Sequence, residues 1–190
     1  MECSKEKNFL NHMKNTGINM RKYQLPGEYE AVCVNKEDKK WLHLIFQDYS
    51  SKVSEYTAVS QYIYAHFISE NYMGNSIIKE IAQAFLGIAI VEMFHLDILG
   101  DLILKLGGNP KFRDGSKKNW KSNFVPYGRS VKENLQLAIK AENEAINQYE
   151  KHIKIIKNQS INKLLMRIVD DELLHLQIFK QLLIKLEKTI

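Results

Sequence analysis

Two glutamates open closely similar phrases in this sequence, one in each half of the chain. Glu55 begins Glu-Tyr-Thr-Ala-Val-Ser-Gln-Tyr and Glu142 begins Glu-Asn-Glu-Ala-Ile-Asn-Gln-Tyr, so Glu, Ala, Gln and Tyr recur at the same offsets. A Glu-x-x-His motif follows each phrase, at residues 92–95 and again at residues 172–175. A glutamate and a histidine three residues apart lie on one face of a helix, so each motif can give two side chains to one site.

The order of these groups along the chain is typical of a two-metal site inside a four-helix bundle. Four carboxylates carry four negative charges, which two divalent cations balance, and two neutral imidazoles complete the set. Burying the same groups without cations would cost a large desolvation free energy. Oxygen and nitrogen ligands suit iron or manganese. We therefore predict two divalent metal ions, Fe or Mn, bound by six residues: Glu55, Glu92, His95, Glu142, Glu172 and His175.

The positions of these ligands also suggest their roles. We expect Glu92 and Glu172 to bridge the two metals, while each metal also takes one of the other two glutamates and one histidine. Tyr62 and Tyr149 follow the two terminal glutamates by seven residues, about two helical turns, so they should face the same interior. We name them as candidate catalytic residues that orient a carboxylate or supply an electron or a proton. Simple packing residues are the alternative.

Four further polar residues near the repeated phrases carry a weaker signal. We expect Gln61 and Gln148 at the surface or at a helix cap. We expect His66 and His152 to be exposed, and the alternative for both is a place beside the metal ligands or on an entry path.

Apolar positions recur with helical spacing over most of the chain, and no segment alternates as a strand does. We predict an all-α fold, a four-helix bundle with helices at about 35–70, 76–106, 130–157 and 160–190. Short turns make the first two helices, and then the last two, antiparallel neighbours. Residues 107–129 form a long crossover that can return the chain to the opposite end of the bundle, at roughly 3.3 Å per extended residue.

A chain of 190 residues is long enough for one sizeable core, and we predict a single domain over residues 1–190. The bundle occupies residues 36–188, and residues 1–34 form an N-terminal tail or strap over it. The most apolar stretch, residues 81–106, is interrupted by acidic groups and a histidine. It therefore predicts a buried core helix rather than a membrane span.

Charge and cysteine content exclude several classes of protein. The formal net charge is +5 and the lysines are scattered, which gives little support to nucleic-acid binding. Cys3 and Cys33 form no C-x-x-C, which argues against a disulfide framework, a zinc ribbon or a rubredoxin-type iron site. We expect two inert thiols. No apolar signal segment is visible near the N-terminus, so we expect a cytoplasmic location.

The motifs resemble the ferritin-like superfamily, and most nearly its manganese-catalase-like and rubrerythrin-like branch. The phrase at residues 54–62, Ile-Val-Glu-Met-x-His-Leu-x-Ile-Leu-Gly at residues 90–100 and Asp-Glu-x-x-His at residues 171–175 carry the resemblance. It covers about residues 36–188. It implies a dimetal-carboxylate fold whose members include peroxide-disproportionating enzymes, peroxidases, ferroxidases and oxygen-activating enzymes.

Two departures from rubrerythrin bear on the reaction. The chain lacks the two C-x-x-C pairs of a rubredoxin-like domain, so an electron donor would be a separate protein. Ala145 stands where rubrerythrin typically carries an extra glutamate, which weakens a peroxidase mechanism based on metal movement. A symmetric ligand set without a donor domain suits cycling of the metal pair alone, as in catalase-type disproportionation.

We therefore predict an oxidoreductase that disposes of hydrogen peroxide at a dinuclear centre, by a catalase-type or a peroxidase-type reaction. Its partners would be hydrogen peroxide or dioxygen and other copies of the chain in a homo-oligomer, with no nucleic acid and no membrane. One alternative is a ferroxidase or iron-storage protein. Another is a structural helical bundle in which the metals act only as a staple.

Overall fold

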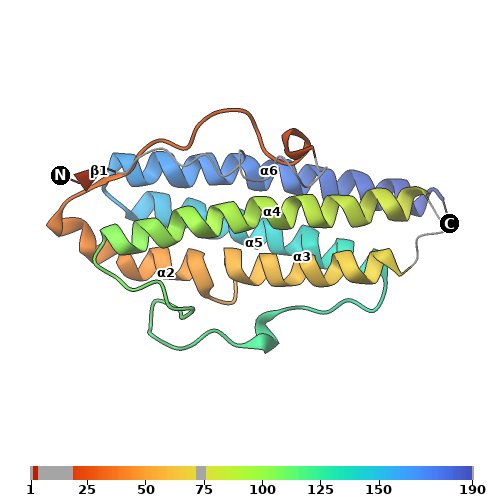
Figure 1. Cartoon of the computed structure of the whole chain (residues 1–190), viewed down its shortest axis with the longest axis horizontal. Coiled ribbons are helices and arrows are strands. Elements are labelled where there is room, and N and C mark those ends of the chain that lie inside the picture. Colours follow the sequence, from red (N-terminus) through yellow and green to blue (C-terminus); the bar gives the residue numbers. More distant parts are fainter. Residues whose placement is uncertain (1, 4–18, 72–75, 190) are drawn as a thin grey trace.

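A computed structural model of the protein describes residues 2–3, 19–71 and 76–189. Four long helices run side by side in it (Figure 1): α3 (Glu55–Glu70), α4 (Ser76–Lys105), α5 (Val131–Ile155) and α6 (Gln159–Glu187). The strands among the described residues are limited to β1 (Glu2–Cys3) and β2 (Cys33–Val34). The predicted all-α bundle is therefore confirmed. Most of the predicted first turn, residues 72–75, lies outside the described part of the chain.

The prediction of a single first helix is wrong. A 3-10 helix, η2 (Lys36–Trp41), leads into α2 (Leu42–Ser50), and the chain then breaks before α3 begins at Glu55. In the break, Ser54 Oγ donates to the Ser51 carbonyl at 2.8 Å and also caps the first turn of α3. Serine side chains that bond the nearby backbone compete with a continuing helix. The break makes Glu55 the first residue of α3.

Side-chain caps also fix where α5 and α6 begin. Ser130 Oγ accepts from the Glu133 amide at 3.1 Å at the start of α5. Asn158 Oδ1 accepts from the amides of Ser160 and Ile161 at 2.9 and 3.1 Å at the start of α6. Each cap satisfies amides that have no partner within the helix. The caps therefore help to fix the position of each later residue of α5 and α6 along the bundle axis.

The helices pair as the turn lengths predicted, α3 with α4 and α5 with α6. The connection from α4 to α5 runs along α2 and α3 from one end of the bundle to the other (Figure 1) and contains η3 (Ser122–Phe124). Near its two ends, Tyr49 Oη donates to the Pro110 carbonyl and Tyr64 Oη to the Gly128 carbonyl, both at 3.1 Å. The predicted long crossover between the two helical hairpins is confirmed.

Two apolar clusters fill the bundle on either side of a polar middle layer. On α4, the first cluster ends at Val91 and the second begins at Leu99. On α6, Ile168 belongs to the second cluster and Phe179 to the first. Four of the predicted metal ligands, Glu92, His95, Glu172 and His175, lie in the gaps between the two clusters on these helices. The apolar side chains on both sides of this layer therefore keep its polar groups away from solvent.

Residues 19–34 lie over α4 and α6, on the side of the bundle away from the crossover (Figure 1). This segment, here called the strap, contains η1 (Met20–Lys22) and β2. The Leu25 amide donates to Asp171 Oδ1 at 2.8 Å, and Arg167 donates to the Leu25 carbonyl at 2.6 Å. Residues 1 and 4–18 of the predicted tail lie outside the described residues.

The expectation that Cys3 and Cys33 are two inert thiols is wrong, because Cys33 is disulfide-bonded. The antiparallel register of β1 and β2 places the backbone of Cys3 opposite Cys33. Two isolated cysteines in a sequence give no signal for this arrangement, which depends on the strap folding back beside the start of the chain.

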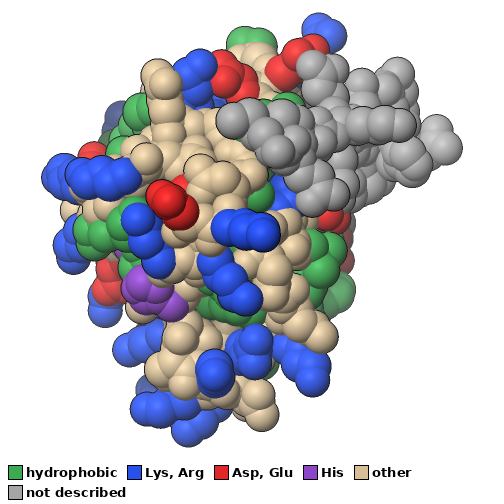
Figure 2. Space-filling view, turned by 90° about the vertical axis from the view of Figure 1, so that its left-hand side faces the viewer, with side chains coloured by type: hydrophobic (Ala, Val, Ile, Leu, Met, Phe, Trp, Pro, Cys, Tyr) green, Lys and Arg blue, Asp and Glu red, His purple; other side chains and the backbone are tan. Residues whose placement is uncertain are grey.

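The described helices include none that is both long and apolar enough to cross a membrane. Figure 2 shows one end of the bundle, where Lys and Arg side chains are spread among polar and apolar atoms. The basic groups on this face do not form one continuous patch, in agreement with the scattered lysines of the sequence.

Candidate metal centre

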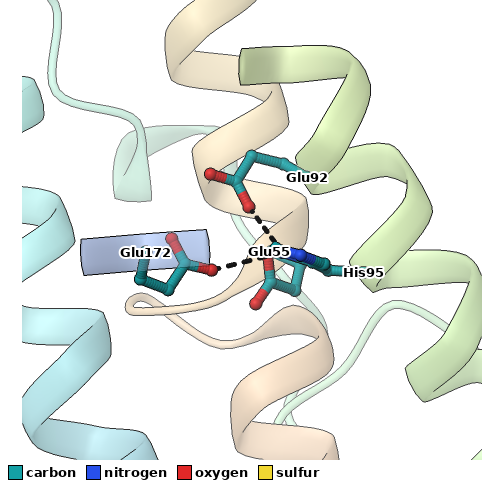
Figure 3. A group of neighbouring side chains, drawn as sticks. All are labelled: Glu55, Glu92, His95 and Glu172. Carbon is teal, nitrogen blue, oxygen red and sulfur yellow. Dashed lines mark hydrogen bonds and ion pairs between the residues drawn. The ribbon is translucent and has the colours of Figure 1, made fainter. Parts of the chain in front are cut away.

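Six side chains from four helices converge in the polar middle layer, and each is at most 3% exposed. Their ligand atoms form two overlapping groups, and the atoms of each group lie within 4.8 Å of one another. The first group (Figure 3) is Glu55, Glu92, His95 and Glu172, and the second is Glu92, Glu142, Glu172 and His175. The structure thus brings together all six residues that were predicted as ligands, and their binding of metal stays a prediction.

The two glutamates shared by both groups each direct their two oxygens toward different histidines. Glu92 Oε2 lies 3.1 Å from His95 Nδ1, while its Oε1 lies 3.0 Å from His175 Nδ1. Glu172 Oε1 lies 3.2 Å from His95 Nδ1, while its Oε2 lies 3.3 Å from His175 Nδ1. A carboxylate that faces two positions in this way has the geometry expected of a bridging ligand.

The other two glutamates each face one histidine. Glu55 Oε2 lies 3.6 Å from His95 Nδ1, and Glu142 Oε1 lies 3.9 Å from His175 Nδ1. Each half of the cluster therefore holds one imidazole Nδ1, one glutamate of its own and both shared glutamates. The two helical hairpins contribute equivalent halves, as the repeated sequence phrases indicate.

The cluster fits a pair of divalent cations. Glu92 Oε1 and Glu172 Oε1 are buried and make no well-aligned hydrogen bond, and their near neighbours are the imidazole nitrogens that also face the cluster. Carboxylate oxygens and imidazole nitrogens that crowd together away from water lose hydration, and a cation between them would replace it. The oxygen and nitrogen donors suit iron or manganese. These six residues can therefore hold a dinuclear metal centre.

The carboxylates and imidazoles of the cluster shift one another's pKa values. Burial raises the pKa of Glu55 and of Glu142 well above the ordinary value, and the charges of Glu172 and Glu92 raise it further. Burial opposes protonation of His175, but the Glu92 charge and hydrogen bonds to Glu172 and Glu92 raise its pKa to about 10. Protons therefore compete with cations for the same atoms.

Each candidate tyrosine donates a hydrogen bond to a cluster glutamate on the other helix of the pair α3 and α5. Tyr62 on α3 donates to Glu142 Oε1 on α5 at 2.6 Å, and Tyr149 on α5 donates to Glu55 Oε1 on α3. Burial raises the pKa of both phenols well above the ordinary value, and the charges of Glu142 and Glu55 respectively add to this. Both tyrosines therefore stay protonated donors, and the shared interior predicted for them is confirmed.

The strap supplies partners for the outer nitrogen of each histidine, which sequence reasoning missed. His175 Nε2 lies 2.8 Å from the Tyr23 carbonyl, so it can donate there and leave Nδ1 free to face the cluster. His95 Nε2 lies 3.0 Å from Tyr29 Oη and 3.3 Å from Asp171 Oδ2. Such partners fix the tautomer and orientation of a ligating imidazole. The one available sequence signal was Asp171 directly before Glu172.

Asp171 is the centre of this network beside His95. It accepts from Tyr29 Oη and from the Leu25 amide, and Arg167 Nη1 lies 2.7 Å from its Oδ1. Burial opposes its ionisation, but the hydrogen bonds and charge of His95, with help from Tyr29 and Arg167, lower the Asp171 pKa. Burial raises the pKa of Tyr29 to about 12. The network thus holds an ionised carboxylate against the outer face of His95.

The expectation that His66 and His152 are exposed is wrong, because they are 8% and 5% exposed. His66 Nδ1 lies 2.9 Å from the Ala82 carbonyl. His152 Nδ1 lies 2.8 Å from Oδ1 of Asp48, a fully buried carboxylate, and Gln148 Nε2 donates to the same oxygen at 2.9 Å. The break before α3 leaves α2 as a separate element, and α2 carries Asp48.

A cavity of about 300 Å³ reaches the cluster between α3 and α5. Its outer lining includes the exposed Lys52 and Lys140, and its inner lining includes all four glutamates and both tyrosines of the cluster. The outer nitrogens of the two histidines face the strap on the opposite side. The cavity therefore gives a small molecule a route to the carboxylate side of the cluster.

Comparison with protein families finds that a model of the ferritin-like domain matches residues 53–189. Comparison with curated proteins finds no significant relative.

Solved structures share this fold. A manganese catalase, KatB from Anabaena, is 25% identical with a TM-score of 0.72, over 82% of this chain and 76% of that chain. A Desulfovibrio desulfuricans bacterioferritin with a diiron site is 24% identical with a TM-score of 0.66, over 82% and 86%. The Mycobacterium tuberculosis bacterioferritin BfrA is 21% identical with a TM-score of 0.63, over 83% and 90%. The similarity to the two bacterioferritins supports the fold alone.

Proposed function

Since the chain belongs to the ferritin-like family, we propose that it is an oxidoreductase that disposes of hydrogen peroxide at a dinuclear iron or manganese centre. The observation that carries this proposal is the pair of shared glutamates, each of which faces both histidines. The similarity to a manganese catalase supports the same reaction class. Glu55, Glu92, His95, Glu142, Glu172 and His175 would hold the metals.

A bound pair of iron or manganese ions would supply Lewis acidity and the two electrons that interconvert peroxide with water or with dioxygen. The protein contributes the surroundings of that chemistry. Tyr62 and Tyr149 hold Glu142 and Glu55 in place and line the route by which peroxide reaches the cluster. The strap holds the outer nitrogens of His95 and His175. The apolar clusters on both sides exclude bulk water.

Peroxide disproportionation is the favoured reaction, because the ligand set is symmetric and this reaction needs no electron donor. In that reaction two peroxide molecules give two waters and one dioxygen, with no external reductant. Purified protein loaded with manganese or with iron should therefore evolve dioxygen from peroxide in buffer alone. Glu92→Ala and His175→Ala should abolish this activity, while Glu150→Ala, an exposed residue of α5 outside the cavity lining, should retain it.

Other outcomes of the same assays would identify the alternatives. Consumption of peroxide only when a reductant is added would favour a peroxidase. Oxidation and uptake of ferrous iron far beyond two ions per chain would favour a ferroxidase or iron-storage protein. Two bound metals without any redox turnover would favour a structural helical bundle, in which the metals only stabilise the fold. Anomalous scattering at the iron and manganese edges, on crystals of purified protein, would identify the metal.

A further inference from the structure

The outer face of α6 exposes more large apolar side chains than the other long helices do. Met166, Leu173 and Ile184 are 46%, 49% and 52% exposed, whereas α3, α4 and α5 each expose one large apolar side chain among the described residues. The three residues are spaced by seven and eleven positions, so they point in nearly the same direction on a helix of 3.6 residues per turn. They form a stripe about 27 Å long. Single exposed apolar residues are ordinary, but an aligned set on one helix indicates a contact surface.

Five exposed polar residues continue this stripe: Lys163, Asp170, Gln177, Lys180 and Glu187. Together with the three apolar residues they follow one another in alternating steps of three and four. This spacing is the pattern of a coiled-coil seam, and the series covers about three and a half heptads. The buried residues of α6 lie on the other side of the helix. We call this exposed series the outer seam of α6.

The outer seam is complementary to itself when two copies meet in opposite directions. Each residue then lies opposite the one that is equally far from the midpoint of the seam. Met166 of one copy lies opposite Ile184 of the other, and Asp170 lies opposite Lys180. A two-fold axis makes each of these contacts occur twice. A parallel pair would instead bring each Asp170 against Asp170 of the other copy, and like charges in contact are unfavourable.

The inner charged residues of the seam have no salt bridge within the described part of the chain. Lys163 and Glu187, at the two ends of the seam, already bind Glu30 at 3.0 Å and Lys132 at 2.7 Å. The side chains of Asp170 and Lys180 make no such contact with any described residue. The two lie ten positions apart, about 15 Å along α6, so they cannot pair with each other in one chain. An antiparallel second copy brings them together.

We propose that the outer seam of α6 binds a second copy of this chain, with the two helices antiparallel about a two-fold axis between Leu173 and Gln177. The apolar residues supply the buried contact, and the pair of Asp170 with Lys180, formed twice, sets the direction and the register. The proposal does not depend on the proposed reaction, because the seam lies on the side of α6 away from His175.

An exchange of charges tests the pairing between copies. Asp170→Lys brings lysines together at two places and should weaken the dimer at least tenfold, because like charges replace opposite ones. The double variant Asp170→Lys/Lys180→Asp restores opposite charges and should return to within about threefold of the wild type, since the pair is only reversed. Glu150→Lys, on the exposed face of α5, changes the net charge as Asp170→Lys does and should leave the dimer unchanged. Analytical ultracentrifugation from about 1 to about 100 µM covers the affinities expected of an exposed seam.

A second pair of variants tests the apolar part of the seam. Ile184→Glu places a charge opposite Met166 at two places, and we expect at least a tenfold loss of dimer affinity, because the charge loses hydration. Ile155→Glu is the matched control, since Ile155 is 48% exposed at the end of α5. Both variants should keep the thermal stability and the metal content of the wild type, because both side chains are exposed.

A wild type that stays monomeric at about 100 µM, above the affinities of most specific protein pairs, would overturn the proposal. Equal dissociation of Asp170→Lys and Glu150→Lys, or a double variant that does not recover, would overturn it as well. If the wild type forms a larger assembly, Asp170→Lys should lower its mass, and an unchanged mass would contradict the seam. Peroxide turnover on the same samples reports separately on the proposed function.

Discussion

Tyr62 donates to Glu142 across the bundle, with 2.6 Å between the phenol oxygen and Oε1, while the equivalent tyrosine of the repeat, Tyr149, donates back to Glu55. Each of the helices α3 and α5 thus carries a glutamate of the cluster and the tyrosine that holds the glutamate of the other helix. The exchange ties the two hairpins together at the cluster. It also explains why the glutamate and the tyrosine recur seven residues apart in both phrases.

Removal of one phenol should weaken metal binding without removing a ligand. Tyr62→Phe leaves Glu142 free to rotate, and we expect roughly a tenfold loss of metal affinity, the lower end of effects seen for residues behind metal ligands. Tyr149→Phe should cost a similar factor, and the double variant about the product, because the two pairs are separate. Competition with a metal chelator measures the affinity. Tyr64→Phe, which loses only a bond to the Gly128 carbonyl, should match the wild type.

Shared and terminal glutamates should differ in how many metals their loss removes. Glu142→Ala takes one ligand from one half of the cluster, so we expect about one tightly bound metal per chain to remain. Glu92→Ala takes a ligand from both halves and should leave less than one. Native mass spectrometry counts the metals, with Glu150→Ala, an exposed residue of α5 outside the cavity lining, as the control. Equal stoichiometries for Glu142→Ala and Glu92→Ala would contradict the bridging role.

Metal affinity should rise with pH. The imidazole of His175, whose pKa is raised to about 10, and the carboxyls of Glu55 and Glu142, whose pKa values are also raised, must lose protons before they can bind a cation. Protons and metals therefore compete at neutral pH, and lower pH favours the protons. Calorimetry in buffers of different ionisation enthalpy should detect proton release on metal binding. A pH-independent affinity between pH 6 and pH 8 would contradict this expectation.

Two glycines of α4 should respond oppositely to alanine. A Cβ on Gly87 would clash with the Tyr23 ring of the strap, whose carbonyl faces His175. We expect Gly87→Ala to lower the free energy of unfolding by about 1–3 kcal/mol, as overpacking does, and also to weaken metal binding. A Cβ on Gly100 would lie 3.6 Å from the Tyr49 ring, an ordinary contact. Gly100→Ala should therefore raise stability by about 0.5–1 kcal/mol, because alanine favours a helix interior. Urea unfolding measures both.

The buried Asp48 should depend on His152. His152→Ala leaves the carboxylate without its imidazole partner, and we expect a loss of about 3 kcal/mol in the free energy of unfolding. His152→Asn keeps an N–H donor near the Nδ1 position and should recover about half of that loss. Equal stabilities of the two variants in urea unfolding would show that packing, and not the hydrogen bond, accounts for the effect.

The two helical hairpins and the ligand cluster could be predicted from patterns between residues that are close together in the sequence. Helical periodicity, a capping serine and short turns predict the two hairpins, and the repeated Glu and Glu-x-x-His spacing places six ligands at one height. These features depend on residues close together in the chain, which is why they could be predicted. The extent of the first helix was wrong, because Ser51 and Ser54 form local bonds that end α2 before Glu55.

Only the tertiary structure decided what lies around the ligands. Tyr23, Tyr29 and Asp171 reach His175 and His95 because the strap folds over α4 and α6. Gln61 and Gln148 occupy equivalent positions in the repeat, yet Gln148 Nε2 donates to Asp48 on α2, whereas Gln61 Nε2 makes no hydrogen bond. Such contacts join residues that are distant in sequence, and no local spacing encodes them. The sequence therefore determined the cluster, and the fold determined its outer partners and the cavity that leads to it.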